Sequence, residues 1–184
     1  MPDVTHGTIA IFKENAAKVS TTVVELNNLE EAASYALSLC SGRSGKVFAA
    51  PGLPEEILPA IGEQANKAGI KLVRQDLRAC LKDIGVSFTR GDMALADTAS
   101  VIMSNQGEDA RLASMLSEVH VIAVPKAKVA NGSYEAEDYL AEALAGTMYT
   151  TFISGCSRTS DIERVLTLGV HGPLELHVAL ITEE

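Results

Sequence analysis

The segment Val119-His120-Val121-Ile122-Ala123-Val124 decides the fold of this 184-residue chain. All its residues are apolar except one histidine, and most of them are β-branched, which favours a strand. Because polar residues do not alternate along it, we expect both faces of this strand to be buried. A strand of this kind is typical of a parallel sheet that helices cover on each side.

Short apolar runs alternate with helical patterns on both sides of this segment. The other expected strands cover residues 22–26, 46–50, 70–73, 93–96, 100–103, 150–153 and 175–181. The expected helices cover residues 28–40, 59–69, 77–84, 111–116, 134–144 and 161–168. This alternation requires crossover connections, so the sequence predicts the α/β class with a largely parallel sheet.

Two local signals sharpen this prediction. Asn28, followed three residues later by Glu31, has the spacing of a capping box and marks the start of a helix. The apolar runs 93–96 and 100–103 leave no room for a helix between them, so we expect a hairpin there. No linker is long enough to split the chain, and we expect one domain over residues 1–184 with residues 1–20 as an N-terminal helical extension.

Charge and cysteine content narrow the classes of partner. The net charge is −9 and basic residues do not cluster, which disfavours nucleic acid and anionic membranes as partners. Cys40, Cys80 and Cys156 lack C-x-x-C spacing, so we expect no metal or cofactor in this chain and free thiols in a reducing compartment. Neither a leader-like N-terminus nor an apolar run long enough to span a membrane is present, and we expect a cytoplasmic protein.

Three loops carry candidate chemistry, and the first is residues 97–100. Asp97 is a candidate base, while Thr98 and Ser100 could bind a ligand through their hydroxyl groups and a nest of backbone N–H groups. An ordinary turn is the alternative, because Asp and Thr commonly bond their own backbone.

The second loop, residues 154–163, collects hydroxyl groups, a guanidinium and carboxylates. Arg158 could hold a carboxylate or phosphate through two bonds, and Gly155 lets a ligand approach the backbone. The other candidate residues of this loop are Ser157 and Thr159 as ligand-binding residues and Asp161 as a base. A helix cap in which Ser160 pairs with Glu163 is the alternative.

The third loop, residues 169–173, follows the same expected helix. His171 is a candidate acid or base because imidazole titrates near neutral pH, although a histidine after a helix is also stabilised by the helix dipole. Gly169 is expected to cap that helix. His120 and His177 lie within strands and are expected to be core or strand-edge residues. We expect the three loops to converge at one end of the sheet.

Several blocks of sequence resemble the LUD domain family. They are Gly85-Val86-Ser87-Phe88-Thr89, Ala96-Asp97-Thr98-Ala99-Ser100, Arg111-Leu112-Ala113-Ser114, Val119–Pro125, Ile153–Glu163 and Leu166–Val178. The family usually has Glu-Thr-Gly where this chain has Asp97-Thr98-Ala99, and Ser-Gly-Pro-Ser where it has Ser154-Gly155-Cys156-Ser157. If the family glycine is left-handed, Ala99 carries strain of about 1 kcal/mol.

The resemblance implies a three-layer α/β/α sandwich like that of ribose-phosphate isomerase, glucosamine-phosphate deaminase and CoA transferases. It also implies a subunit of a bacterial L-lactate oxidation system, in which partner subunits carry the iron–sulfur clusters. On this hypothesis the chain itself has no cofactor and offers a site for a small carboxylate or phosphate. The alternatives are a stand-alone sugar-phosphate isomerase or CoA-transferase-like enzyme, and a non-catalytic assembly module.

Overall fold

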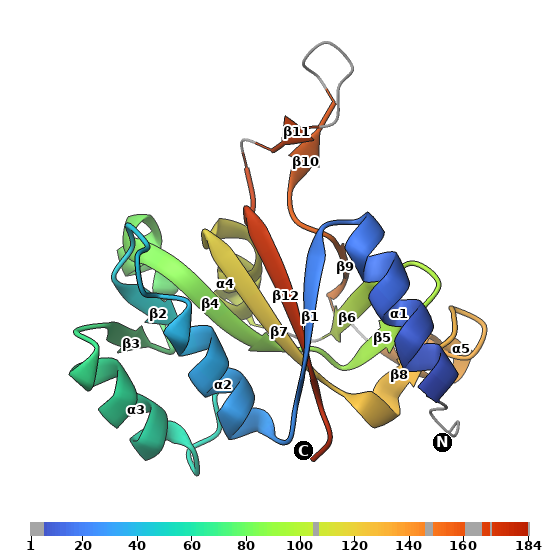
Figure 1. The fold of residues 1–184 in the computed structure, drawn as a ribbon, viewed down its shortest axis with the longest axis horizontal. Helices are drawn as coiled ribbons and strands as arrows, with labels where there is room; N and C mark the ends of the chain where they lie inside the picture. The colour runs from blue at the N-terminus through green and yellow to red at the C-terminus, as the bar shows by residue number, and fades with distance from the viewer. Residues whose placement is uncertain (1–5, 105–106, 146–148, 161–166, 170, 184) are drawn as a thin grey trace.

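The structure is a computed structural model that describes residues 6–104, 107–145, 149–160, 167–169 and 171–183. Its centre is a six-stranded sheet with the strand order β1-β12-β7-β4-β2-β3 (Figure 1). The strands are β1 (Thr21–Leu26), β2 (Val47–Ala49), β3 (Lys71–Val73), β4 (Ile84–Arg90), β7 (Val119–Pro125) and β12 (Glu175–Ile181). Every neighbouring pair is parallel, which confirms the α/β class.

The strand β7 is buried along its whole length, as its apolar sequence predicts. One face, with Val121 and Ala123, packs in a core with α2 (Leu29–Ser38) and α3 (Leu58–Lys67). The other face, with Ile122 and Val124, packs in a second core that holds β12 and the opposite layer. Alternation of side chains along a strand sends neighbouring residues to these two separate cores.

The opposite layer contains both helices and a second sheet. Its elements are α1 (His6–Lys18), α4 (Glu108–Leu116) and a four-stranded sheet in the order β8 (Val129–Ala130), β5 (Met93–Leu95), β6 (Ser100–Ser104), β9 (Thr150–Ser154). The helix α5 (Glu137–Ala145) packs against the far side of this small sheet. The expected three layers are therefore present, and the expected hairpin is the antiparallel pair of β5 and β6.

Three details of the sequence prediction need correction. The strand β4 was not expected, because its small and polar residues hide the apolar alternation. The strand expected at 150–153 is β9, but it belongs to the small sheet, where it forms a partly exposed edge. Of the residues expected to form a helix at 161–168, the last two form a strand instead: β11 (Thr167–Leu168) pairs antiparallel with β10 (Arg158–Thr159). Residues 161–166, including Asp161, lie outside the described residues.

The hairpin of β10 and β11 projects from the body of the molecule (Figure 1). It stands at the end of the sheet where β7 and β12 begin, which we call the amino edge. Gly169 follows a strand rather than a helix and therefore does not act as a helix cap.

The connections reverse direction between β2 and β4. The chain passes from β2 outward to β3 through α3, and from β4 in the other direction to β7 through α4. The helices α3 and α4 lie on opposite faces of the sheet. The helix α3 shares a core with Phe48 of β2, and α4 shares another core with the preceding residue, Val47. In open parallel sheets such a switch point opens a crevice at the carboxyl ends of the strands. A short turn of 3₁₀ helix, η1 (Leu77–Asp83), separates β3 from β4.

The capping signal at the start of α2 is confirmed. Asn28 accepts a hydrogen bond from the backbone N–H of Glu31 (2.9 Å) through its side chain. The carboxylate of Glu31 accepts a bond from the backbone N–H of Asn27 (2.9 Å), one residue earlier than an ideal capping box places it. No helix among the described residues is long and apolar enough to cross a membrane.

Three non-glycine residues among those described have left-handed backbone: Ser20, Asp76 and Ala99. Ala99 has a φ of +50°, so the turn between β5 and β6 keeps this conformation without glycine. Its methyl group is fully buried, and that burial offsets part of the conformational cost. Ser20 has a φ of +56° between α1 and β1, but its side chain is exposed and brings no such gain.

Replacing Ser20 with glycine is therefore expected to stabilise the protein. Glycine adopts positive φ without a Cβ penalty, so Ser20→Gly should raise the free energy of unfolding by about 0.5–1 kcal/mol. Urea unfolding at pH 7 measures the change. Ser20→Ala is the matched control, and equal stability of the Gly and Ala variants would contradict the account.

Candidate functional site

Two of the three predicted loops come together at the amino edge. The backbone N–H of Ser157 donates to the carbonyl of Pro173 (2.9 Å), and Gly169 donates to the carbonyl of Ser157 (2.9 Å). The hydroxyl of Ser157 also donates to the carbonyl of His171. The hydroxyl group and the backbone of Ser157 are therefore occupied in holding the base of the hairpin.

The first loop meets the second through their hydroxyl groups. Ser100 and Ser154 face each other across β6 and β9 and share a hydrogen bond, and Ser100 donates to Thr98 (2.8 Å). The carboxylate of Asp97 is exposed and lies beside Gly132, where a Cβ would come 2.7 Å from its Oδ2. Within the described residues, no hydrogen bond or ion pair joins Asp97 to His171 or Arg158.

The position of the second and third loops differs from the usual place of a ligand. Leu174 donates to the carbonyl of Glu118 (2.9 Å), which places the third loop where β7 and β12 begin. Gly155 packs against the carbonyl of Val19, so its open backbone serves a close contact within the protein. Parallel sheets bind ligands at the opposite, carboxyl ends of their strands.

A polar cavity of about 280 Å³ lies at those carboxyl ends, beside the switch point. We call it the carboxyl-edge cavity, and its lining residues are Pro51, Gly52, Arg90, Gly91, Asp92, Pro125 and Lys128. They follow β2, β4 and β7, which are adjacent strands of the sheet. The topology of the fold therefore creates this cavity.

Gly91 and Gly52 allow the chain to form the cavity wall. A Cβ at Gly91 would lie 2.4 Å from Cγ1 of Val101, so only glycine lets the chain leave β4 and pass to the small sheet. Its N–H still donates to the carbonyl of Ala123 (2.8 Å) and completes the pairing with β7. Gly52 has a φ of +78°, a conformation that favours glycine, in the turn after β2.

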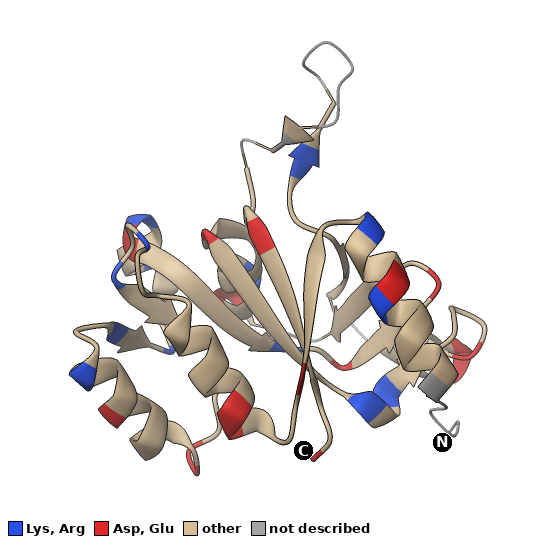
Figure 2. Ribbon diagram, in the orientation of Figure 1, with Lys and Arg blue, Asp and Glu red and all other residues tan. Residues whose placement is uncertain are grey.

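Two positive charges face this cavity although the whole chain carries a charge of −9. Arg90 is exposed at the end of β4, and no ion pair of its guanidinium is found in the part of the chain that the structure describes. Lys128 is half-buried at the end of η2 (Lys126–Lys128), the short helix between β7 and β8. Figure 2 shows basic residues on β4 and on η2 at this edge of the sheet.

Asp92 supplies the acidic group of the cavity and is fixed by the backbone of β6. Its Oδ2 accepts a hydrogen bond from the N–H of Ser104 (2.6 Å), and its own N–H donates to the carbonyl of Ile102 (2.8 Å). The hydroxyl of Tyr139 donates to Oγ of Ser104 (2.8 Å), and burial raises the pKa of Tyr139. This carboxylate is therefore oriented by its neighbours before any ligand binds.

A second cavity of about 230 Å³ adjoins the first and is mainly apolar. Besides Asp92 and Lys128, which line both cavities, its lining residues are Met93, Ala127, Val129, Ala130 and Tyr139. We call it the apolar cavity. It lies between the small sheet, η2 and α5, so the layer that the small sheet adds to the fold provides its walls.

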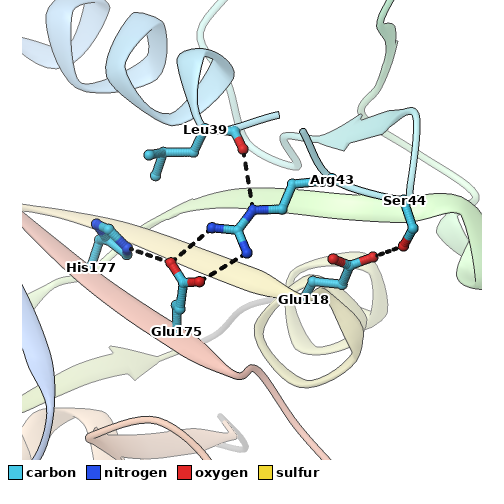
Figure 3. A network of polar contacts seen from close by, with 6 residues as sticks. All are labelled: Leu39, Arg43, Ser44, Glu118, Glu175 and His177. Atoms are coloured by element: carbon cyan, nitrogen blue, oxygen red, sulfur yellow. Dashed lines mark hydrogen bonds and ion pairs between the residues drawn. The ribbon is translucent and has the colours of Figure 1, made fainter. Parts of the chain in front are cut away.

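A polar network at the amino edge has a structural role (Figure 3). Arg43 binds both carboxylate oxygens of Glu175 (2.8 and 2.9 Å), and it holds the pKa of that carboxyl below its ordinary value. Nε2 of His177 lies 3.4 Å from Glu175, and its Nδ1 lies 2.8 Å from the hydroxyl of Tyr35. Burial lowers the pKa of His177, against the opposing effect of Glu175. The network ties the end of α2 to the start of β12.

The sequence reasoning missed Arg90, Asp92 and Lys128. The signal was present in Thr89-Arg90-Gly91-Asp92, where a charged pair surrounds a glycine directly after a strand. Without β4 as a strand, this segment has no place at the carboxyl edge. Among the described residues, no three His, Cys, Asp or Glu side chains gather as metal ligands.

The chain is similar to proteins named lactate utilization protein C. It is 25% identical to that of Geobacillus thermodenitrificans (strain NG80-2), over 95% of this chain and 78% of that protein. It is 25% identical to that of Anoxybacillus flavithermus (strain DSM 21510 / WK1), over 94% of this chain and 80% of that protein. A match with lactate utilization protein C 1 of Bacillus mycoides (strain KBAB4) is 31% identical but covers 55% of this chain and 44% of that protein.

The fold has a counterpart among solved structures. The crystal structure of a DUF162 family protein from Deinococcus radiodurans superposes with a TM-score of 0.69 at 20% identity, over 95% of this chain and 96% of that one. The family model of the LUD domain matches residues 9–181. This match covers nearly the whole chain, from α1 to the last strand, and the chain therefore belongs to the LUD domain family.

Proposed function

We propose that this chain is a component of a bacterial lactate-utilisation system and that it binds a small carboxylate in the carboxyl-edge cavity. The names of its relatives support the system. The observation that carries the site is the position of Arg90 and Lys128 beside the switch point of an otherwise acidic protein. A switch point is where ligands bind in sheets of this kind.

The chemistry of the cavity favours a carboxylate with one negative charge. Arg90 can hold a carboxylate through two parallel N–H···O bonds, and Lys128, which also lines the cavity, adds a second positive charge. The carboxylate of Asp92 is fixed nearby and would repel a doubly charged phosphate more strongly than a carboxylate. It can accept a hydrogen bond from a neighbouring hydroxyl, which lactate carries next to its carboxylate.

The proposal assigns redox chemistry to partner subunits. Cys40 and Cys156 are buried, and burial raises the pKa of Cys40 to about 11, which disfavours its thiolate. On this proposal, iron–sulfur clusters belong to the partners in the cytoplasm, and this chain binds and presents the carboxylate without a cofactor of its own. The alternative anion site is the hairpin base, where Arg158 would be the clamp.

The test compares the two arginines. Arg90→Ala should weaken L-lactate binding by about 10–100-fold, because hydrogen bonds to a charged group are lost. Arg90→Lys should recover part of the affinity, because it keeps the charge and loses the fork. Isothermal titration calorimetry with L-lactate measures both effects, and thermal melts check that each variant folds.

Arg158→Ala is the matched control and should leave affinity unchanged. The same variants in a host that needs this gene for growth on lactate test the system. Weaker L-lactate binding in Arg158→Ala, with normal binding in Arg90→Ala, would move the site to the hairpin base.

A further inference from the structure

We infer that the site is built for 2-hydroxy carboxylates whose side chain is larger than the methyl group of lactate. This inference rests on the proposed function and specifies its ligand class. It comes from the arrangement of the two cavities, which share Asp92 and Lys128 as lining residues.

The size of the site exceeds that of lactate. The two cavities, of about 280 and 230 Å³, adjoin and together reach the volume typical of small-molecule sites, about 300–1,000 Å³. Lactate has only a methyl group beyond its polar atoms. With its carboxylate at Arg90, it would leave the apolar cavity unfilled.

The apolar cavity has the surface that a hydrocarbon or aromatic side chain needs. Val129 and Ala130 contribute buried aliphatic groups, and Met93 is half-buried beside them. Tyr139 adds a ring whose hydroxyl is already bonded to Ser104, so the ring is fixed before a ligand arrives. Methionine adapts its shape, and an aromatic ring favours contact with a second ring.

The shared residues determine the order of groups along the ligand. Arg90 lines only the polar cavity and binds the carboxylate, while Asp92 lies between the cavities and accepts the hydroxyl at the next carbon. The side chain attached to that same carbon then enters the apolar cavity. In a 2-keto acid the oxygen on this carbon carries no hydrogen, so it offers Asp92 no donor. Such an acid is expected to bind more weakly.

The experiment measures calorimetric affinities of the full chain for L-lactate, L-3-phenyllactate and phenylpyruvate. Burial of the phenyl ring should make L-3-phenyllactate bind at least about 10-fold more tightly than L-lactate. Phenylpyruvate should bind more weakly than phenyllactate. The reverse order would overturn the role of Asp92.

Two variants that fill the apolar cavity test whether the higher affinity for phenyllactate arises there. Ala127→Trp and Met93→Trp should lower the affinity for phenyllactate to about that for L-lactate, so that the advantage of phenyllactate is lost. Ala79 is an exposed alanine of η1 that lines neither cavity, so Ala79→Trp is the matched control and should change neither affinity. Persistence of the advantage in both cavity variants would overturn the placement.

The outcomes separate this inference from the proposed function. If L-lactate binds through Arg90 and phenyllactate binds no more tightly, this inference fails and the proposed function stands. If neither acid binds to the wild-type chain, both fail. Tighter phenyllactate binding that is lost in Arg90→Ala and in the cavity variants supports both.

Discussion

Lowering the pH from 7 to 4.5 is expected to reduce the free energy of unfolding by ~3 kcal/mol through His120 alone. This side chain is fully buried in β7, and burial lowers its pKa to about 3. Its Nε2 lies 2.8 Å from the hydroxyl of Thr89, and its Nδ1 has no partner among the described residues. No nearby carboxylate among them stabilises a charge on the ring.

The direction of the effect follows from the two pKa values. In the unfolded chain His120 takes up a proton below about pH 6.5, whereas in the folded protein it stays neutral until about pH 3. The stabilisation is therefore complete above pH 6.5 and is lost as the pH falls between these values. The lowered pKa of His177 adds a further loss of stability as the pH falls.

Urea unfolding of His120→Gln at pH 7 and pH 4.5 tests this account. Glutamine keeps a polar group near Thr89 but does not titrate, so the variant should lose ~3 kcal/mol less on acidification than the wild type. A stability difference at pH 7 does not affect this comparison. His171→Gln, at an exposed histidine, should behave like the wild type. Equal acid losses in all three proteins would contradict the assignment.

Gly85→Ala is expected to destabilise the protein by ~3 kcal/mol or more, at the upper end of the range for overpacking. A Cβ at Gly85 would lie 2.6 Å from the carbonyl oxygen of Gly45, and a Cβ at Gly45 would lie 2.4 Å from the backbone nitrogen of Gly85. The obstacle is backbone on both sides, so no side chain can rotate away.

Gly62→Ala provides the matched control for Gly85→Ala. Gly62 lies within α3, and a Cβ there meets nothing within 4 Å. Alanine is the better helix former, so this variant should gain up to about 1 kcal/mol. Urea midpoints of both variants measure the two effects. Similar midpoints for Gly85→Ala and the wild type would contradict the close contact of the two glycines.

The elements that the sequence predicts well are those whose signal is local. The run 119–124 is apolar on both sides and forms a central strand, and Asn28 with Glu31 marks a helix start through short-range hydrogen bonds. The short connection between 93–96 and 100–103 leaves only a reversal as its solution.

The elements that the sequence misses depend on distant partners. In β4, the buried hydroxyls of Ser87 and Thr89 find hydrogen-bond partners on other elements, among them Ser117 and His120. Thr167 pairs with Thr159 between two antiparallel strands, so the end of the expected helix is a strand instead. The carboxyl-edge cavity depends on β4, so its residues could not be located without that strand.

The position of β12 between β1 and β7 has a consequence for biosynthesis. Thr21 pairs with Leu176, so the first strand to leave the ribosome stays without its neighbour in the sheet until almost all described residues have been made. Closing so long a loop slows folding, and the waiting edges of β1 and β7 are open to wrong pairing. Chaperones that shield nascent strands should therefore matter more for this protein than for one whose sheet grows in chain order.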